Sequence, residues 1–411
     1  MTRALPSRPS VQGRFGVSEG ATRVGSLPAR AIGWAGLVLA VIASMLPGTA
    51  AAGTGAARPA GGGLGTRTVA RLDRTLRSTW ASTWAPGVIA GVWVGDRGWT
   101  AALGSAQRAA GPRPLLVDHT RIGSVTKTMI GTLVLELVDR HKLRLDESIA
   151  RWFPQLPDAG QITIRELGDM SSGIASYTTN TTFTDRYFSD PTMSWTPDQL
   201  IAGGAALPRT FAPGDGFDYS DTNFVMLGRI LEMVTHKPLA QLFRAMLFKP
   251  LGMNASSYPT GNRLPSPYLH GYTIQGSNKG NVLDSTNWSP SSAAGAGQAI
   301  STLGDLHRWT VAVGTGRLLT PAAQRARLIP NPASIAGGRA YLFALGRDHG
   351  WLAHEGQIPG YNTQIAYLPK LKATIVVIAN TDIANASLVT PVTAIFQELA
   401  RVIAPRNVPT G

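Results

Sequence analysis

A serine and a lysine three residues apart are the side chains of this 411-residue chain whose types and spacing most directly permit chemistry. Ser124 and Lys127 precede an apolar run with helical spacing, and positions i and i+3 of a helix share one face. The Lys127 amine could therefore activate the Ser124 hydroxyl, and the unpaired N–H groups of a first helical turn favour a developing negative charge. No other lysine of the chain has a serine three positions before it. The alternative interpretation is a helix N-terminal serine beside a solvated lysine.

A tyrosine in a turn directly before a second apolar helix is the next candidate. Tyr219 precedes a helix that carries Phe224, Leu227 and Ile230 along one side. A nearby ammonium group favours the phenolate form of a tyrosine, so Tyr219 close to Lys127 could accept the Ser124 proton and later pass it to a leaving group. The alternative is a half-buried aromatic residue with a hydrogen-bonded hydroxyl.

A histidine on a strand late in the sequence supplies the third candidate. We expect His354 on a strand that runs beside Ser124, and Gly356 on the same strand to let a substrate approach the backbone closely. The Gln357 N–H could then join the Ser124 N–H in an oxyanion hole. The remaining six histidines have no comparable context, and we expect none of them to be catalytic.

Strand and helix signals place these candidates in one sheet-centred unit. We predict a helix at 66–80, a hairpin at 87–94 and 98–103, strands at 354–356, 363–368 and 373–379, and a closing helix at 392–403. The sheet would thus take strands from both ends of the chain, with a mainly helical insertion at about 140–300. We expect the polar and aromatic segment 177–195 to be a surface or cleft-rim loop.

Composition indicates a globular protein and narrows the class of partner. Hydrophobic residues make up 44% and charged residues 15% of the chain. The formal net charge is +14, but the basic residues are scattered, with no run interleaved with aromatics, so we expect no nucleic-acid partner. The apolar segment 31–46 has arginines before it and Ala50, Ala51 and Ala52 after it, which favours a cleaved signal peptide over a retained anchor. The chain has no cysteine, so neither a lipidated cysteine nor a disulfide is available.

These elements, in this order, resemble the serine β-lactamase and penicillin-binding protein superfamily, in particular its class C β-lactamase and DD-carboxypeptidase branch with related esterases and D-aminopeptidases. The resemblance runs from about Val69 to Ile403 and includes connecting phrases such as 162–167, 219–228, 248–253, 301–306 and 354–361. It implies an α/β (α+β) fold of the β-lactamase/transpeptidase type: an antiparallel sheet built from both chain ends, flanked by helices, with an inserted helical subdomain.

The resemblance also implies a chemistry and a domain plan. Ser124 would form an acyl-enzyme, and Lys127 and Tyr219 would accept and donate the protons. Water would then hydrolyse the acyl-enzyme, without a metal or an organic cofactor. The substrate would be a small molecule or peptide: a peptidoglycan stem peptide, a β-lactam or an ester. We expect a signal peptide or membrane anchor at 1–52, a flexible linker at 53–65, the hydrolase domain at 66–405 and a tail at 406–411, hence a secreted or envelope protein, tethered to the membrane if the anchor is retained.

Two positions depart from the family's common motifs. Asp221 stands where an asparagine usually helps hold the substrate, and Glu355 stands where a hydroxyl usually helps bind the substrate's carboxylate. Two added carboxyl groups would repel an anion, so we expect less dependence on a substrate carboxylate than in a dedicated β-lactamase, unless a protonated His354 binds that anion near neutral pH.

The resemblance favours an exported serine hydrolase that acts on an amide or ester, of the D-alanyl-D-alanine carboxypeptidase or β-lactamase-related type. Other functions remain as alternatives. An esterase or a D-aminopeptidase on the same fold would use the same residues. A non-catalytic peptidoglycan-binding homologue would be expected to lack Ser124, Lys127 or Tyr219, and all three are present. An α/β-hydrolase would need a G-x-S-x-G elbow, which the sequence lacks. No feature of the sequence indicates an oligomeric state.

Overall fold

The computed structural model describes residues 63–108, 111–277 and 280–410. The expected signal peptide or anchor, and all but the last three residues of the expected linker, lie outside these residues. Within the described ranges, no helix combines the length and apolar character needed to cross a bilayer.

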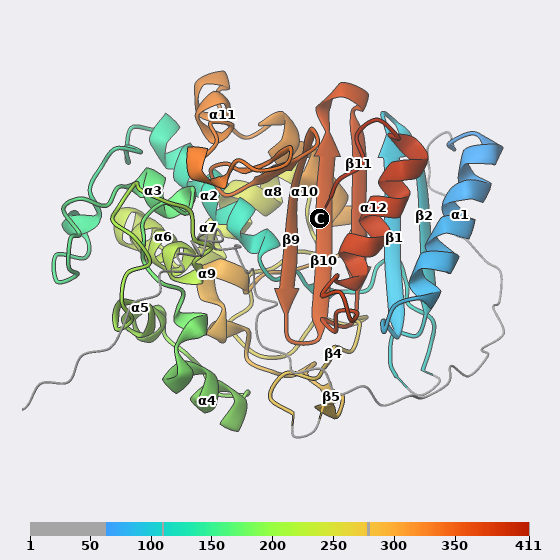
Figure 1. The fold of residues 1–411 in the computed structure, drawn as a ribbon, viewed down its shortest axis with the longest axis horizontal. Coiled ribbons are helices and arrows are strands. Elements are labelled where there is room, and N and C mark those ends of the chain that lie inside the picture. Colours follow the sequence, from blue (N-terminus) through green and yellow to red (C-terminus); the bar gives the residue numbers. More distant parts are fainter. Residues whose placement is uncertain (1–62, 109–110, 278–279, 411) are drawn as a thin grey trace, which may run out of the picture. The chain divides into compact units, whose positions relative to one another are not determined.

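A seven-stranded antiparallel sheet organises the molecule (Figure 1). Its strand order is β2-β1-β11-β10-β9-β8-β7, so strands from the two chain ends are neighbours, as predicted. Register is set at the junction by pairs such as Gly91 with Val376. The strands are β1 (Gly87–Val94), β2 (Arg97–Gly104), β7 (Arg339–Tyr341), β8 (Gly346–Asp348), β9 (Trp351–Ile358), β10 (Tyr361–Leu368) and β11 (Ala373–Ala379). The short strands β7 and β8 were not predicted, because three residues are too few to show a period of two.

Two helices from the chain ends cover one face of the sheet. They are α1 (Thr66–Ala81) and α12 (Pro391–Ile403), and both bury an apolar side in the same core cluster. Leu72 and Leu76 of α1 meet Ile395 and Leu399 of α12 there, together with the sheet residues beneath them. The amphipathic pattern of each helix therefore accounts for its place in the fold.

The opposite face carries the helix that follows Ser124. This helix, α2 (Val125–Asp139), is buried over its first thirteen residues because helices and strands surround it. Trp309 of α10 (Leu303–Thr315) donates its indole N–H to the Thr128 hydroxyl of α2 at 2.8 Å. An apolar helix enclosed on all sides is rigid, and it fixes the position of the side chains on its first turn.

Most of the remaining helices lie between β2 and β7 in the sequence. They are α3 (Ile164–Gly168), α4 (Thr181–Ser189), α5 (Pro197–Ala205), α6 (Asp221–Thr235), α7 (Leu239–Leu242), a π-helical turn (Phe243–Phe248), α8 (Lys249–Leu251), α9 (Ala294–Gly297) and α11 (Pro321–Arg327). Two small sheets pair β3 (Thr120–Arg121) with β6 (Ile300–Ser301), and β4 (Tyr272–Thr273) with β5 (Leu283–Asp284).

The segment 177–195 is not the loop that the sequence suggested. It contains a 3₁₀ turn (Tyr177–Thr179) and α4, whose N-cap Asn180 accepts the Thr182 N–H. Its aromatic residues Tyr177, Phe183 and Tyr187 are buried and pack on one another. The prediction was wrong because a nine-residue helix shows too few turns to reveal its period against an aromatic background.

Candidate active site

Ser124 stands at the N-cap of α2, at the end of a turn held against the edge of the large sheet. Gly123 has φ +49°, which a side chain would disfavour, and it delivers the chain from β3 into the helix. The Ser124 side chain makes no capping bond to its own helix. Its oxygen instead accepts a hydrogen bond from Lys127 Nζ at 2.8 Å, the i to i+3 contact expected from the spacing.

Lys127 is fully buried, and its amine has three oxygen partners. Besides Ser124 Oγ, Nζ contacts Asp221 Oδ1 at 2.6 Å and the Ala296 carbonyl at 2.8 Å. Burial lowers the pKa of Lys127, while the Asp221 charge and hydrogen bond oppose that shift. The geometry suits both protonation states: an ammonium donates to all three oxygens, whereas a neutral amine donates to two and accepts the proton of Ser124.

Asp221 is the first residue of α6, where its charge complements the helix dipole. Its Oδ2 accepts hydrogen bonds from Ser176 at 3.3 Å and Thr178 at 3.5 Å, and its backbone N–H donates to Ser176 Oγ at 3.1 Å. The carboxylate is thus tied to Lys127 on one side and to hydroxyl groups on the other. It neutralises the lysine charge locally instead of facing a substrate.

Tyr219 reaches the same centre from the turn before α6. Its ring centroid lies 4.9 Å from Lys127 Nζ, and its hydroxyl shares a hydrogen bond with Ser124. Burial and then the Asp221 charge raise the pKa of Tyr219 well above 10, and the Ser124 hydrogen bond opposes this only partly. The expected phenolate is therefore not the resting form, because burial first, and then the Asp221 charge, keep the proton on the phenol.

The nucleophile turn and strand β9 touch through two glycines. A Cβ on Gly356 would lie 1.9 Å from the Ile122 carbonyl oxygen, and a Cβ on Gly123 would lie 2.7 Å from the Gln357 nitrogen. Gly356 therefore lacks a side chain because the nucleophile turn packs directly against it. Its contacts are with that turn, and they do not show the expected close approach of a substrate. The same contact brings the Gln357 nitrogen close to Gly123, the residue before Ser124, and the oxyanion-hole role of the Gln357 N–H remains a prediction.

His354 faces this centre from β9, but it is not the near-neutral anion receptor that the sequence suggested. Its Nδ1 lies 2.6 Å from the Glu355 carbonyl, so Nδ1 carries the proton and Nε2 can accept from the Tyr341 hydroxyl at 3.3 Å. Burial and then the Lys127 charge lower the pKa of His354 to about 4. The imidazole is therefore neutral at physiological pH.

Glu355 points to the other side of the sheet, because successive residues of a strand alternate between faces. Its carboxylate accepts hydrogen bonds from Asn362, Thr390 and Thr393 at 2.7 to 2.9 Å, at the start of α12. The expectation that Glu355 would repel an anionic substrate inside the site is wrong. Of the two unusual carboxylates, only Asp221 belongs to the site.

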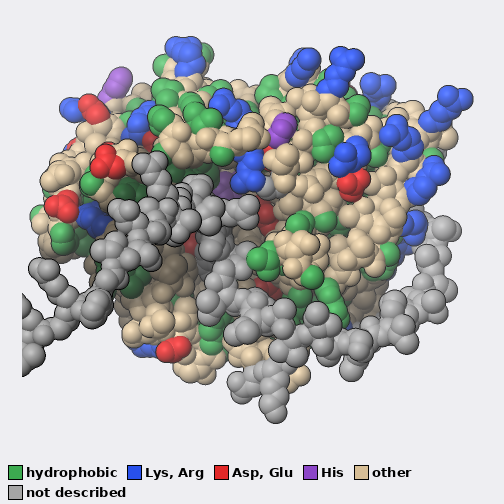
Figure 2. All heavy atoms as spheres, viewed as in Figure 1, with side chains coloured by type: hydrophobic (Ala, Val, Ile, Leu, Met, Phe, Trp, Pro, Cys, Tyr) green, Lys and Arg blue, Asp and Glu red, His purple; other side chains and the backbone are tan. Residues whose placement is uncertain are grey.

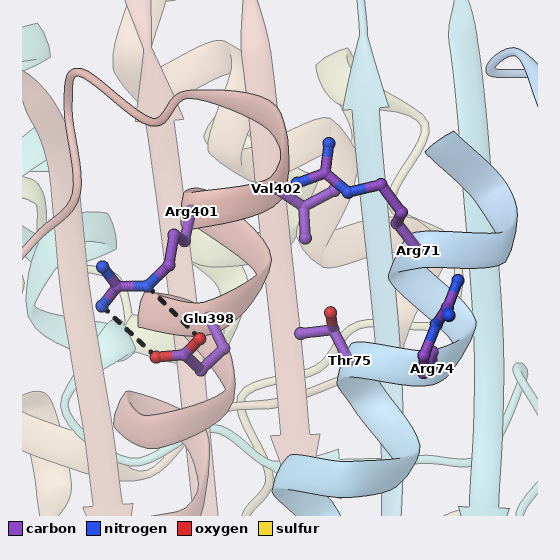
Figure 3. A pocket seen from close by; sticks show the side chains of 6 residues that line it. All are labelled: Arg71, Arg74, Thr75, Glu398, Arg401 and Val402. Atoms are coloured by element: carbon purple, nitrogen blue, oxygen red, sulfur yellow. Dashed lines mark hydrogen bonds and ion pairs between the residues drawn. The ribbon is translucent and has the colours of Figure 1, made fainter. Parts of the chain in front are cut away.

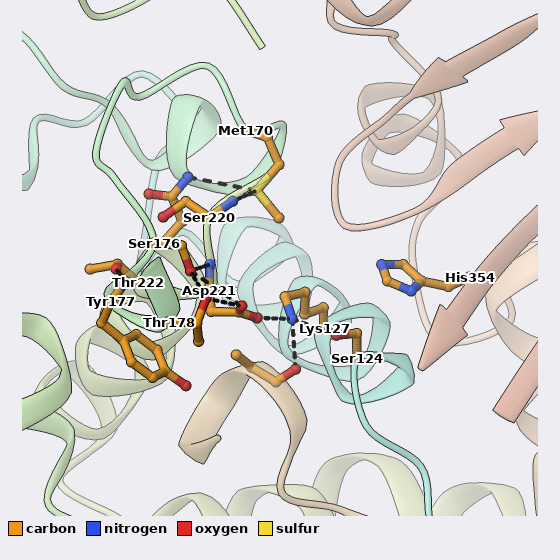
Figure 4. Close-up of polar contacts among 12 residues, drawn as sticks. Ser124, Lys127, Met170, Ser176, Tyr177, Thr178, Ser220, Asp221, Thr222 and His354 are labelled. Atoms are coloured by element: carbon orange, nitrogen blue, oxygen red, sulfur yellow. Dashed lines mark hydrogen bonds and ion pairs between the residues drawn. The ribbon is translucent and has the colours of Figure 1, made fainter. Parts of the chain in front are cut away.

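The structure gathers the predicted residues and adds others. Figure 4 shows Asp221, Lys127 and Ser124 in a row, with His354 on the strand opposite. Ser176, Thr178, Tyr341 and the Ala296 carbonyl were not foreseen, since none belongs to a motif and a backbone carbonyl leaves no trace in a sequence. The buried Arg121 guanidinium, which no motif indicates as structural, donates to the carbonyls of residues 262, 286 and 288 and joins the nucleophile strand to that loop.

The arrangement is suited to nucleophilic acyl transfer. A hydroxyl at a helix N-terminus contacts an amine and a phenol in a largely buried setting, and the turn that carries it packs against strand β9. Across the described residues, no three His, Asp or Glu side chains converge as a metal site requires.

Comparison with known proteins agrees with this chemistry. The family model described as Beta-lactamase matches residues 72–400. The putative penicillin-binding protein PbpX of Bacillus subtilis (strain 168) is 27% identical over 270 residues, 65% of this chain and 63% of the relative. Esterase EstB of Burkholderia gladioli is 33% identical over 184 residues, 41% of this chain and 46% of the relative. The matches therefore span less than two thirds of these relatives.

Solved structures match over a larger part of the chain. A D-stereospecific amidohydrolase from Streptomyces sp. is 28% identical with a TM-score of 0.71, over 81% of this chain and 97% of that one. The D-amino acid amidase of Ochrobactrum anthropi SV3 complexed with D-phenylalanine is 25% identical with a TM-score of 0.73, over 81% and 99%. Because the matching model spans most of the sheet and the nucleophile helix, the chain belongs to the Beta-lactamase family and carries the fold of its serine hydrolases.

Proposed function

We propose that this protein is an extracytoplasmic serine hydrolase that forms an acyl-enzyme on Ser124 and prefers neutral amides or esters, among them D-amino-acid derivatives. The observation that carries the chemistry is the 2.8 Å contact between Lys127 Nζ and Ser124 Oγ at the start of a buried helix. The apolar segment 31–46, with arginines before it and small residues after it, supports export.

Acylation would begin from the minor form in which Lys127 is neutral. Ser124 Oγ attacks the substrate carbonyl carbon as its proton passes to Lys127 Nζ, and the Ser124 and Gln357 N–H groups face the resulting oxyanion. Tyr219, protonated at rest because of its raised pKa, donates its proton to the leaving nitrogen or oxygen as the carbonyl bond to that atom breaks. The Lys127 ammonium then returns a proton to Tyr219. Water attacks the ester by the reverse path and releases the acid.

The charges in the site support the preference for neutral substrates. The Lys127 charge is compensated by Asp221, and His354 is uncharged at neutral pH. Neither group therefore offers the uncompensated cation that a substrate carboxylate would seek. The similarity to an esterase and to D-amino acid amidases is in keeping with this preference. The similarity to a penicillin-binding protein keeps a D-alanyl peptide or a β-lactam as the second candidate.

Active-site labelling tests the nucleophile. A fluorophosphonate, followed by peptide mass mapping, is expected to modify Ser124, and Ser124→Ala is expected to abolish both labelling and turnover. Lys127→Ala should lower kcat/KM by about three orders of magnitude or more. Ser220→Ala is the matched control, because that neighbouring buried hydroxyl has no partner within the described structure. Label on another residue, or wild-type rates in either active-site variant, contradicts the assignment.

A substrate panel tests the preference. We expect kcat/KM for a p-nitrophenyl ester or a D-phenylalanine amide to exceed that for a D-alanyl-D-alanine peptide or a cephalosporin. Cephalosporin turnover far above that of every ester, amide and D-alanyl peptide would overturn the preference for neutral substrates while leaving the Ser124 mechanism intact.

A further inference from the structure

A basic groove runs between α1 and α12, on the outer side of the sheet. It has a volume of about 380 Å³ and is lined by Arg71, Arg74, Thr75, Glu398, Arg401 and Val402 (Figure 3). The two helices pack in the core cluster on this face, whereas the first turns of α2 belong to the cluster on the opposite face. The groove is therefore separate from the site around Ser124.

The groove has positive charge that the described residues do not compensate. The Glu398 carboxylate already accepts two hydrogen bonds from the Arg401 guanidinium group, at 3.3 Å each. No carboxylate in the described residues pairs with Arg71 or Arg74, and both side chains are exposed. In Figure 3 the Arg71 side chain extends from α1 toward Val402 of α12. Two guanidinium groups without a carboxylate partner among the described residues thus stand at the mouth of one groove.

The surrounding surface has the same sign. The α1 sequence contains four arginines and a single acid, Asp73, whose carboxylate accepts the Trp99 indole N–H at 3.0 Å. Figure 2 shows lysine and arginine side chains gathered toward the upper right of the view, where Figure 1 places α1 and α12. Guanidinium groups in such a cluster bind phosphate oxygens by paired hydrogen bonds.

The position of the groove in the chain indicates what carries those phosphates. Helix α1 begins at Thr66, twenty residues after the apolar segment 31–46 ends, a span of at most about 70 Å when fully extended. In the full chain, before any cleavage of that segment, helix α1 is thus the first described element after a segment able to enter a bilayer. We propose that the face formed by α1 and α12 docks on an anionic phospholipid surface, with Arg71 and Arg74 binding lipid phosphates.

This docking would also orient the enzyme. Because α2 lies on the other face of the sheet, Ser124 would be held on the side of the molecule turned away from the lipid. Substrates in solution or in a polymer layer above the bilayer could then reach the site. Lipid binding and hydrolysis are separate properties, so one can fail while the other stands.

Vesicle co-sedimentation of the full chain provides the test. Vesicles of phosphatidylcholine alone measure binding through the apolar segment. Vesicles that also contain anionic phosphatidylglycerol measure the additional binding that comes from electrostatic attraction. Arginine near an anionic bilayer strengthens binding roughly fivefold, so the double variant Arg71→Gln, Arg74→Gln should bind phosphatidylglycerol vesicles about 30-fold more weakly at low salt. High salt should remove this difference, and the two chains should bind neutral vesicles equally.

A charge-matched variant distinguishes this face from overall charge. Arg244→Gln, Arg325→Gln removes two exposed arginines outside α1 and α12 and should keep wild-type vesicle binding. Ester hydrolysis should be unchanged in both double variants. Equal vesicle binding by the wild type and the Arg71, Arg74 variant overturns the proposal. So does binding to duplex DNA or soluble polyphosphate that depends on Arg71 and Arg74 while vesicle binding does not.

Discussion

Replacing Asp221 with asparagine isolates the most unusual feature of the site, the buried ion pair with Lys127. The pair is 2.6 Å long and its side chains are 0% and 4% exposed. Removing one partner of a buried pair costs about 3 to 5 kcal/mol, because the other charge is left uncompensated. The asparagine oxygen can still accept from Nζ, so we expect Asp221→Asn to lower the free energy of unfolding by about 3 kcal/mol at pH 7.

The pH dependence of this loss tests its cause. Burial lowers the pKa of Lys127 in the folded protein, and removing Asp221 lowers it further. Because the pKa of Lys127 is lower in the folded protein than in the unfolded chain, Lys127 of the unfolded chain binds a proton first as the pH falls below about 10.5. This protonation stabilises the unfolded chain relative to the folded protein. The extra penalty of the variant is present where Lys127 of the folded wild type is protonated, so it should disappear as the pH rises above that folded-state pKa, which lies below 10.5. Urea unfolding from pH 7 to 10 measures this difference.

The same variant should change the kinetics in a defined direction. The Asp221 charge raises the pKa of both Lys127 and Tyr219. Its removal should let neutral Lys127 accumulate at lower pH, so the acid limb of kcat/KM for a neutral ester should move to lower pH. Asp305→Asn is the control, because this buried carboxylate on α10 accepts from other groups. An unmoved acid limb, or a stability loss that is constant from pH 7 to 10, would refute the reasoning.

Three further predictions concern strand β9 and its neighbours. Gly356→Ala would place a methyl group 1.9 Å from the Ile122 oxygen, so it should lower the free energy of unfolding by about 2 kcal/mol or more and reduce activity. In the control Gly304→Ala the added methyl meets one flexible side-chain atom at 3.6 Å, so urea unfolding should show little change. Burial lowers the pKa of His354 from 6.5 to about 4, so the free energy of unfolding should fall by about 3 kcal/mol as the pH falls between these values. His354→Gln should abolish this part of the acid destabilisation, and an unchanged pH dependence of the unfolding free energy in that variant would contradict the prediction. Tyr341→Phe removes a hydrogen-bond donor to neutral His354, so the pKa of His354 should rise in an NMR titration and kcat should fall by less than about tenfold. An unchanged His354 titration curve would count against this contact.

Much of the fold could be predicted from the sequence because its signals are local. The apolar runs and intervening turn of β1 and β2, the apolar stripes of α1 and α12, and the i to i+3 relation of Ser124 and Lys127 each lie within one segment. The segment 177–195 and strands β7 and β8 escaped prediction, since a short element contributes too few periods to stand out.

Part of the site also followed from the sequence. Residues from three distant segments were expected to meet, and the structure brings Ser124, Lys127 and Tyr219 together with His354 on the facing strand. Their catalytic roles remain predictions. Tyr341, which bonds His354, lies on a strand too short to be recognised, so nothing in the sequence singled it out.

What the sequence by itself determined is therefore which groups are available: a hydroxyl, an amine, a phenol and an imidazole at spacings that permit acyl transfer. What only the tertiary structure decided is their charge and direction. Strand geometry turns Glu355 away toward α12, burial keeps His354 neutral, and burial together with the Asp221 charge keeps Tyr219 protonated. Protonation depends on desolvation and on charges from elements far apart in the chain, and these distances exist only once the sheet and helices have packed.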